Sequence, residues 1–179
     1  MAFRGTEGGI TMSKNLETLW CLCALLIAQF QVVGKPRTVR VASEGQTTLE
    51  ATSGTTTVKV TIYTHELRTW RHDEINSRQP DSNCVIDRVP CSIADSIRIV
   101  MNGKPVFVFR SVYADLGDLN DAELIVGKQI SILKLSAGDG AEGYFAKIEF
   151  DGKSVRRRTL YVGPDEPSEE TVYHIVEDP

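Results

Sequence analysis

The segment Ile97–Phe109 constrains the fold of this chain more than any other, because two apolar runs flank the dipeptide Asn102-Gly103. Asn-Gly readily adopts the positive backbone dihedrals that a two-residue hairpin turn demands. The segment therefore predicts two antiparallel strands in which Ile99 lies opposite Val106. Both faces of this hairpin are apolar, which predicts that it lies between two layers of the protein.

Several other segments have the alternating apolar pattern that is typical of half-buried strands, whereas His65–Cys84 is charged and turn-rich. The pattern is most regular in Thr56–Thr64, which places its valines and isoleucine on one face. Further strands are predicted at Thr38–Val41, Thr47–Leu49, Gln129–Leu135, Tyr144–Phe150, Ser154–Val162 and Thr171–Val176. A second two-residue hairpin turn is predicted at Asp151-Gly152.

Helix is expected to be scarce, because no segment sustains a helical apolar period over about twelve residues. Ser111–Lys128 is predicted to be a loop with one helical turn around Asn120–Ile125. The fold class that follows is all-β, a small antiparallel sandwich or barrel of about eight short strands with little helix.

A leader is predicted before this domain. Leu19–Phe30 is uncharged and mostly apolar, it follows Lys14, and about a dozen residues are too few to cross a bilayer core that needs roughly 20. Residues 1–34 are therefore predicted to be a signal peptide that is cleaved after Gly34, with Met12 as a second candidate start. An uncleaved membrane anchor and a buried N-terminal helix are the alternatives. The exported product is expected to be a single domain, 35–179, that is periplasmic or extracellular and has no stable membrane span.

The cysteines and the net charge fit an exported protein. Cleavage leaves Cys84 and Cys91 as the only pair, and in an oxidising compartment an even count predicts one disulfide. The formal net charge is −4. An acidic protein is a poor ligand for nucleic acid or anionic lipid, so neither is predicted as a partner.

No catalytic or cofactor site is predicted. Gly138–Gly143 matches the spacing G-x-G-x-x-G, but a strand follows it rather than the helix that would meet a pyrophosphate. His65 and His72 would point to opposite faces of one strand, and nothing in the sequence brings His174 to them. No nucleophile signature is present. Metal and cofactor are therefore both predicted to be absent, and Trp70 is assigned to the core.

Two side chains of the last hairpin are candidates for binding. Arg157 is predicted to lie on an exposed sheet face near Tyr144, where it would either meet a partner or form cross-strand pairs with Glu149 or Glu142. The cross-strand pairs are the favoured interpretation.

The stretch ILKLSAGDGAEGYFAKIEF is a strand that enters a Ser-x-Gly loop and leaves through an aromatic strand. In this respect it resembles the inhibitory loop of bacterial periplasmic lysozyme inhibitors, with Ser136, Gly138 and Tyr144 at the matching positions. The resemblance implies a small exported β-rich protein that inserts this loop into the active-site cleft of a lysozyme. The spacing differs from the tighter Ser-Gly-x-x-Tyr of those families.

The sequence thus predicts an exported, non-catalytic protein that binds a protein or cell-envelope ligand. The resemblance implies that this ligand is a cell-wall hydrolase, which the protein inhibits. The predicted contact residues are Ser136, Gly138, Asp139, Tyr144 and Arg157. One alternative is a small secreted hydrolase or metal-dependent enzyme that uses His65, His72 and Asp73. The other is an envelope structural or assembly subunit that accepts a partner strand at the sheet edge near Pro105.

Overall fold

The computed structural model describes residues 36–67, 90–138, 143–162 and 167–175. Within these ranges the chain forms ten strands and one 3-10 turn, η1 (Arg110–Val112). The strands are β1 (Arg37–Arg40), β2 (Gly45–Ser53), β3 (Thr56–Leu67), β4 (Cys91–Met101), β5 (Lys104–Val106), β6 (Leu119–Ile125), β7 (Ser131–Ala137), β8 (Tyr144–Phe150), β9 (Val155–Val162) and β10 (Pro167–Val172).

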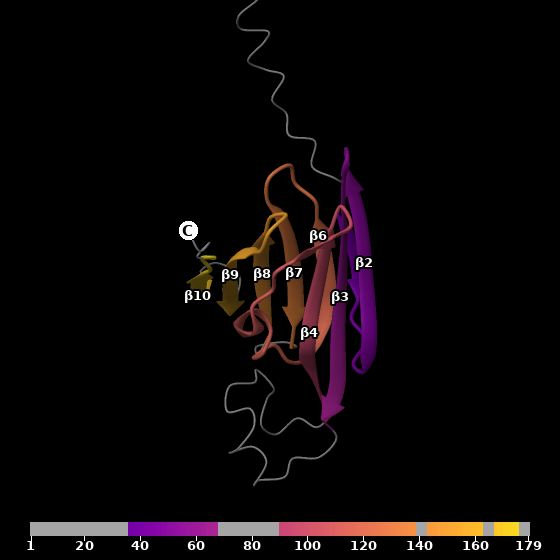
Figure 1. Ribbon diagram of the computed structural model, residues 1–179. Coiled ribbons are helices and arrows are strands. Elements are labelled where there is room, and N and C mark those ends of the chain that lie inside the picture. The colour runs from indigo at the N-terminus through magenta and orange to yellow at the C-terminus, as the bar shows by residue number, and fades with distance from the viewer. Residues whose placement is uncertain (1–35, 68–89, 139–142, 163–166, 176–179) are drawn as a thin grey trace, which may run out of the picture. The chain divides into compact units, whose positions relative to one another are not determined.

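The strands form two antiparallel sheets, which Figure 1 shows facing each other. The larger sheet has the order β1-β6-β7-β8-β9-β10, and the smaller has the order β2-β3-β4-β5. Their inward-facing residues form one core, in which Ile62 of the smaller sheet and Leu133 and Ile148 of the larger sheet are fully buried. The prediction of an all-β sandwich with little helix is confirmed.

The Asn102-Gly103 hairpin forms as predicted. Asn102 has a φ of 51° and Gly103 a φ of 77°, and the Asn102 Oδ1 accepts a 2.8 Å hydrogen bond from the Thr57 N–H. Ile99 lies opposite Val106, where the pairing ends. The expectation that both faces are buried was wrong, because the Phe107 side chain is 57% exposed.

The prediction of a helical turn around Asn120–Ile125 was also wrong, because these residues belong to strand β6. Ala122 and Leu124 are buried at a spacing of two, as in the other strands. A register shift between Leu119 and Asp121 breaks this period at the start of the strand. The irregular start obscures the alternation and leaves a pattern that is as compatible with a helical turn as with a strand.

The turn between β8 and β9 is longer than the two residues predicted. The Asp151 N–H donates to the Ser154 carbonyl over 3.1 Å, so the turn includes residues 151–154. The Asp151 carboxylate accepts hydrogen bonds from the N–H groups of Lys153 and Ser154 and from the Arg156 Nε. This side chain therefore organises the turn. The last predicted strand begins earlier than expected, at Pro167, and ends at Val172.

Candidate functional site

One end of the sandwich gathers the termini of several strands and carries the predicted binding loop. Strand β7 ends there at Ala137 and β8 begins there at Tyr144. Figure 1 shows β3 running to the same end. A cleft of about 530 Å³ lies at this end, and its lining includes Arg40, Glu66 and Gly138.

The wall of this cleft is organised around Asp118. This residue has a φ of 50°, a left-handed conformation that is uncommon outside glycine. Its N–H donates to the Ser92 carbonyl over 2.7 Å, and its Oδ1 accepts from the Ser92 N–H over 3.1 Å. The Asp118 backbone is therefore fixed to the start of β4 in the smaller sheet. A strained residue held this firmly is a feature found often at binding sites.

The base of the β7–β8 connection is tied to the same segment. The Gly138 N–H donates to the Asp118 carbonyl over 3.0 Å, and the Asn120 Nδ2 donates to the Gly138 carbonyl. The Tyr144 hydroxyl donates to the Gly117 carbonyl over 2.7 Å and accepts from the Gly117 N–H over 2.9 Å. Both ends of the connection are thus anchored by hydrogen bonds before it leaves the sandwich.

Tyr144 acts in the structure as an anchor. Its burial raises the pKa of the phenol well above its ordinary value, and the nearby carboxylates of Asp115 and Asp118 add to the increase. The hydroxyl therefore stays protonated and continues to donate to Gly117. The sequence analysis did not identify Gly117 as the partner of Tyr144. It also missed Asp118 and Asn120, the partners of Gly138, although Gly117-Asp118 is a typical turn dipeptide.

Ser136 lies on the outer face of the larger sheet. It is exposed, and it sits between Asp121 of β6 and Phe145 of β8 in the strand register. The Phe145 ring is stacked on Tyr161 of β9, with the ring centroids 4.3 Å apart and the planes at 8°. A groove of about 290 Å³ runs over this region. The sequence analysis selected Ser136 but missed Phe145 and Asp121, since alternation alone does not rank outward side chains.

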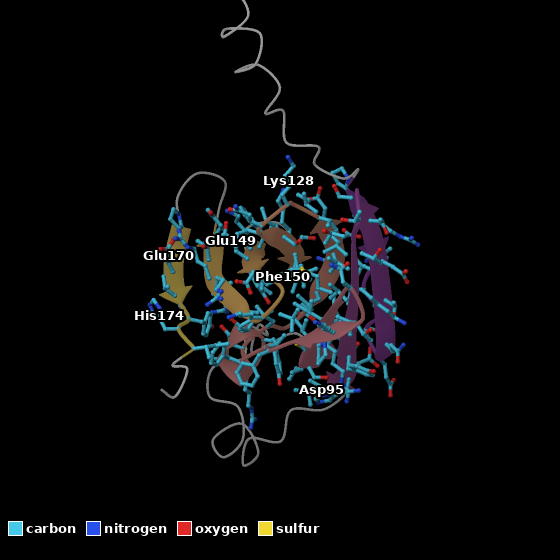
Figure 2. The ribbon with its side chains drawn as sticks, turned by 45° about the horizontal axis from the view of Figure 1, so that its top comes forward. Asp95, Lys128, Glu149, Phe150, Glu170 and His174 are labelled. Carbon is cyan, nitrogen blue, oxygen red and sulfur yellow. The ribbon has the colours of Figure 1, made fainter. Side chains whose placement is uncertain are left out.

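Arg157 does not lie near Tyr144, the predicted contact residue that was expected beside it. Tyr144 pairs with Val162 and Glu149 pairs with Arg157, so five residues of β9, about 17 Å, separate Arg157 from that end. Its guanidinium pairs with Glu149 at 3.4 Å and with Glu170 of β10 at 3.3 Å. The predicted pair with Glu149 is therefore confirmed, and the proximity to Tyr144 was wrong. Figure 2 labels both of these carboxylates.

The neighbouring Arg158 is buried, with 3% of its side chain exposed, and it pairs with Asp115 and Glu169. A register shift at the start of β9 sets which arginine points inward. Because Asp115 lies just before the Gly117–Asn120 segment, this ion pair ties β9 to the segment that holds the loop base.

The histidine candidates are only partly described. The His65 Nδ1 lies 2.7 Å from the Asp95 Oδ1 on an exposed face, and the His174 side chain is exposed beyond β10. His72, Asp73, Trp70 and Asp139 lie outside the described residues. In the part of the chain that the structure describes, no group of three His, Cys, Asp or Glu side chains could hold a metal ion.

The predicted disulfide is described at one end only. Cys91 begins β4 and is fully buried, whereas Cys84 lies outside the described ranges. The pairing therefore stays a prediction, as does the signal peptide at residues 1–34, which are likewise not described.

Two of the edge strands, β5 and β10, carry features that oppose the addition of a partner strand. Strand β5 has only three residues, including Pro105, and the chain after it crosses to the other sheet, where the Phe107 N–H donates to the Lys153 carbonyl over 2.8 Å. Strand β10 begins with Pro167, has a register shift and carries two glutamates. A strand-accepting role near Pro105 has no support in this geometry.

Comparisons with known proteins give no family for this chain. No protein-family model, no curated protein and no solved structure matches it. Among the described residues, no helix has the length and apolarity needed to span a membrane.

Proposed function

We propose that this chain is an exported, non-catalytic binding protein whose contact surface is the end of the sandwich around Gly138. The observation that supports this most directly is the anchored base of the β7–β8 connection. Gly138 and Tyr144 are both joined by hydrogen bonds to one short segment, residues 117–120. Binding residues commonly lie on loops that a rigid scaffold positions. A fixed base also lowers the conformational entropy lost on binding.

The cleft beside this base supports the same surface. At about 530 Å³ it is large enough for protein side chains, and it offers both a cation, Arg40, and a carboxylate, Asp118. Residues 68–90 connect β3 to β4 at this end, and a connection of that length is much longer than the usual 4–6 residues or so. Long connections between strands are common at binding surfaces.

We further propose a cell-wall hydrolase as the partner. The resemblance of the β7–β8 hairpin to lysozyme inhibitors supports this class, as do the predicted export signal and the predicted disulfide. Ser136, one of the three matching positions, is exposed beside the anchored loop base.

The test is inhibition of a panel of lysozymes by the exported, oxidised protein, obtained by expressing the full chain. Ser136→Trp and Arg40→Glu alter the proposed surface, and both sites are exposed, so the fold should tolerate them. Thr55→Trp, in the exposed turn between β2 and β3, is the matched control. Inhibition that is lost in the first two variants and kept in the control would support the surface.

Absence of inhibition for every lysozyme at micromolar protein would exclude this partner class. The binding function would then be tested with immobilised wild-type protein and the two surface variants, each exposed to the same envelope extract. If the variants retain every protein and saccharide that the wild type retains, the proposed surface is wrong.

A further inference from the structure

The groove on the outer face of the larger sheet has two walls of distinct chemistry. It is lined by Thr38, Asp121, Glu123, Lys134, Ser136 and Phe145, on strands β1, β6, β7 and β8. The strand register places Asp121 opposite Ser136, and Ser136 opposite Phe145. Residues that lie opposite one another in a sheet point to the same face. These three side chains therefore form a row across the groove.

The first wall is an open aromatic face. Phe145 and Tyr161 are stacked nearly parallel across β8 and β9, so the ring normal of Phe145 points across the strands. One face of the Phe145 ring is covered by Tyr161. The other face looks toward β7, where Ser136 is too small to cover it. The groove thus has an aromatic face as its wall and a small polar residue as its floor.

The second wall is the carboxylate of Asp121. The structure gives this carboxylate no hydrogen bond or ion pair with any described residue, whereas the adjacent Glu123 pairs with Lys134 at 3.2 Å. Asp121 and Phe145 are separated by β7, that is by two strand spacings, or about 10 Å. A flat group that rests on the Phe145 ring would therefore come close to the Asp121 carboxylate.

We propose that this groove receives a cationic side chain, an arginine of the protein partner. Both walls favour positive charge: the ring face through its quadrupole and Asp121 through its negative charge. A guanidinium is planar, so it can stack on the ring while its edge donates hydrogen bonds to a carboxylate. This inference rests on the proposed function, because it names a chemical group of that partner at a site beside Gly138.

Within the protein itself, the Arg40 guanidinium is the cation that could compete with a partner's arginine for the Asp121 carboxylate. It lies opposite Asp121 on β1, yet it forms no ion pair with it and lines the end cleft. Its removal should therefore leave binding of a cation in the groove unchanged or make it tighter.

The test is an NMR titration of the ¹⁵N-labelled exported protein with N-acetyl-arginine amide. The neutral isostere N-acetyl-citrulline amide is the matched ligand, and N-acetylglucosamine is a neutral saccharide probe. Asp121→Asn and Phe145→Leu alter one wall each, and Arg40→Gln removes the competitor. Glu50→Gln, on the exposed face of the smaller sheet, makes the same charge change away from the groove.

We expect saturable shifts for the arginine probe at Asp121, Ser136 and Phe145. Asp121→Asn and Phe145→Leu should each weaken binding about threefold, the scale of one exposed charge pair or cation–π contact. Glu50→Gln should not change it. Equal binding of the citrulline probe, unchanged affinity in the two wall variants, or weaker binding in Arg40→Gln would each overturn the proposal. Shifts with the saccharide and none with the arginine probe would also overturn it.

The proposed binding surface around Gly138 and the proposed arginine groove can be rejected independently of each other. The arginine probe reports on the groove without any partner, so its failure to bind leaves the surface around Gly138 untouched. Failure of partner capture by the wild-type protein, with arginine binding intact, would reject the proposed function and keep the groove.

Discussion

Replacing Tyr144 with phenylalanine tests whether the hydroxyl holds the base of the β7–β8 connection. The substitution keeps the ring, which packs against the core, and removes one oxygen. Within the part of the chain that the structure describes, that oxygen is the one hydrogen-bond partner of both the N–H and the carbonyl of Gly117, a buried residue. The variant therefore leaves two buried backbone groups without their hydrogen bonds.

The expected cost follows from these two groups. An unsatisfied buried donor or acceptor costs about 1–3 kcal/mol, so we expect the free energy of unfolding to fall by about 3 kcal/mol. For a domain of this size that change corresponds to a decrease in Tm of about 6–12 °C. The loss of packing is small, because the ring is retained.

The assay is urea unfolding followed by circular dichroism, with Tyr161→Phe as the matched control. Tyr161 is half-buried on the outer face, and its hydroxyl has no hydrogen bond with any described residue. The control should change stability by less than about 0.5 kcal/mol. Hydrogen exchange at the Gly138 amide should also accelerate in Tyr144→Phe. Equal stability of the two variants would refute the anchoring role of the Tyr144 hydroxyl.

Three further outcomes are expected. Asp115→Ala leaves the guanidinium of Arg158, 3% exposed, without its nearest carboxylate, and urea unfolding should show a loss of about 3 kcal/mol; a loss below about 0.5 kcal/mol would contradict a structural role for this pair. Burial opposes ionisation of Asp151, but hydrogen bonds from two N–H groups and a guanidinium outweigh it and lower the pKa. The ionised Asp151 carboxylate therefore stabilises the fold above about pH 4, and this contribution is lost as the pH falls through the lowered pKa. The difference in free energy of unfolding between wild type and Asp151→Asn should therefore become smaller in acid. A difference that does not change with pH would contradict this. Reduction of the Cys84–Cys91 disulfide should lower the free energy of unfolding by about 2–3 kcal/mol; a mass that shows two free thiols in the exported protein would reject the pairing.

The sequence was a good guide to the strands wherever the period of two was unbroken. β3 and the hairpin at Asn102 could be predicted because local turn chemistry and alternation agree there. The one strand that was mistaken for another structure begins at a register shift. An extra residue before Asp121 hides the alternation of β6. Such shifts depend on the neighbouring strands, which a local pattern does not contain.

The candidate site was predictable only in part, for a related reason. Gly138 and Tyr144 were selected from a local motif, and the structure places both at one loop base. Their partners are Gly117 for Tyr144, and Asp118 and Asn120 for Gly138. These come from a segment 18 to 27 residues earlier, and the pairing of β6 with β7 brings them close. Phe145 was overlooked because its ring orientation depends on stacking against Tyr161, which lies on the next strand.

The β7–β8 hairpin links the anchored loop base to the arginine groove, and strand geometry keeps the two separate. Tyr144 and Phe145 are adjacent, so their side chains point to opposite faces of the sheet. Tyr144 points inward to Gly117, whereas Phe145 points outward over Ser136. Loss of the Tyr144 hydroxyl should therefore loosen the loop base while the pairing of β7 with β8 holds the groove in place. If Tyr144→Phe leaves the affinity for the arginine probe unchanged but weakens partner binding, the loop base and the groove are held in place by different interactions.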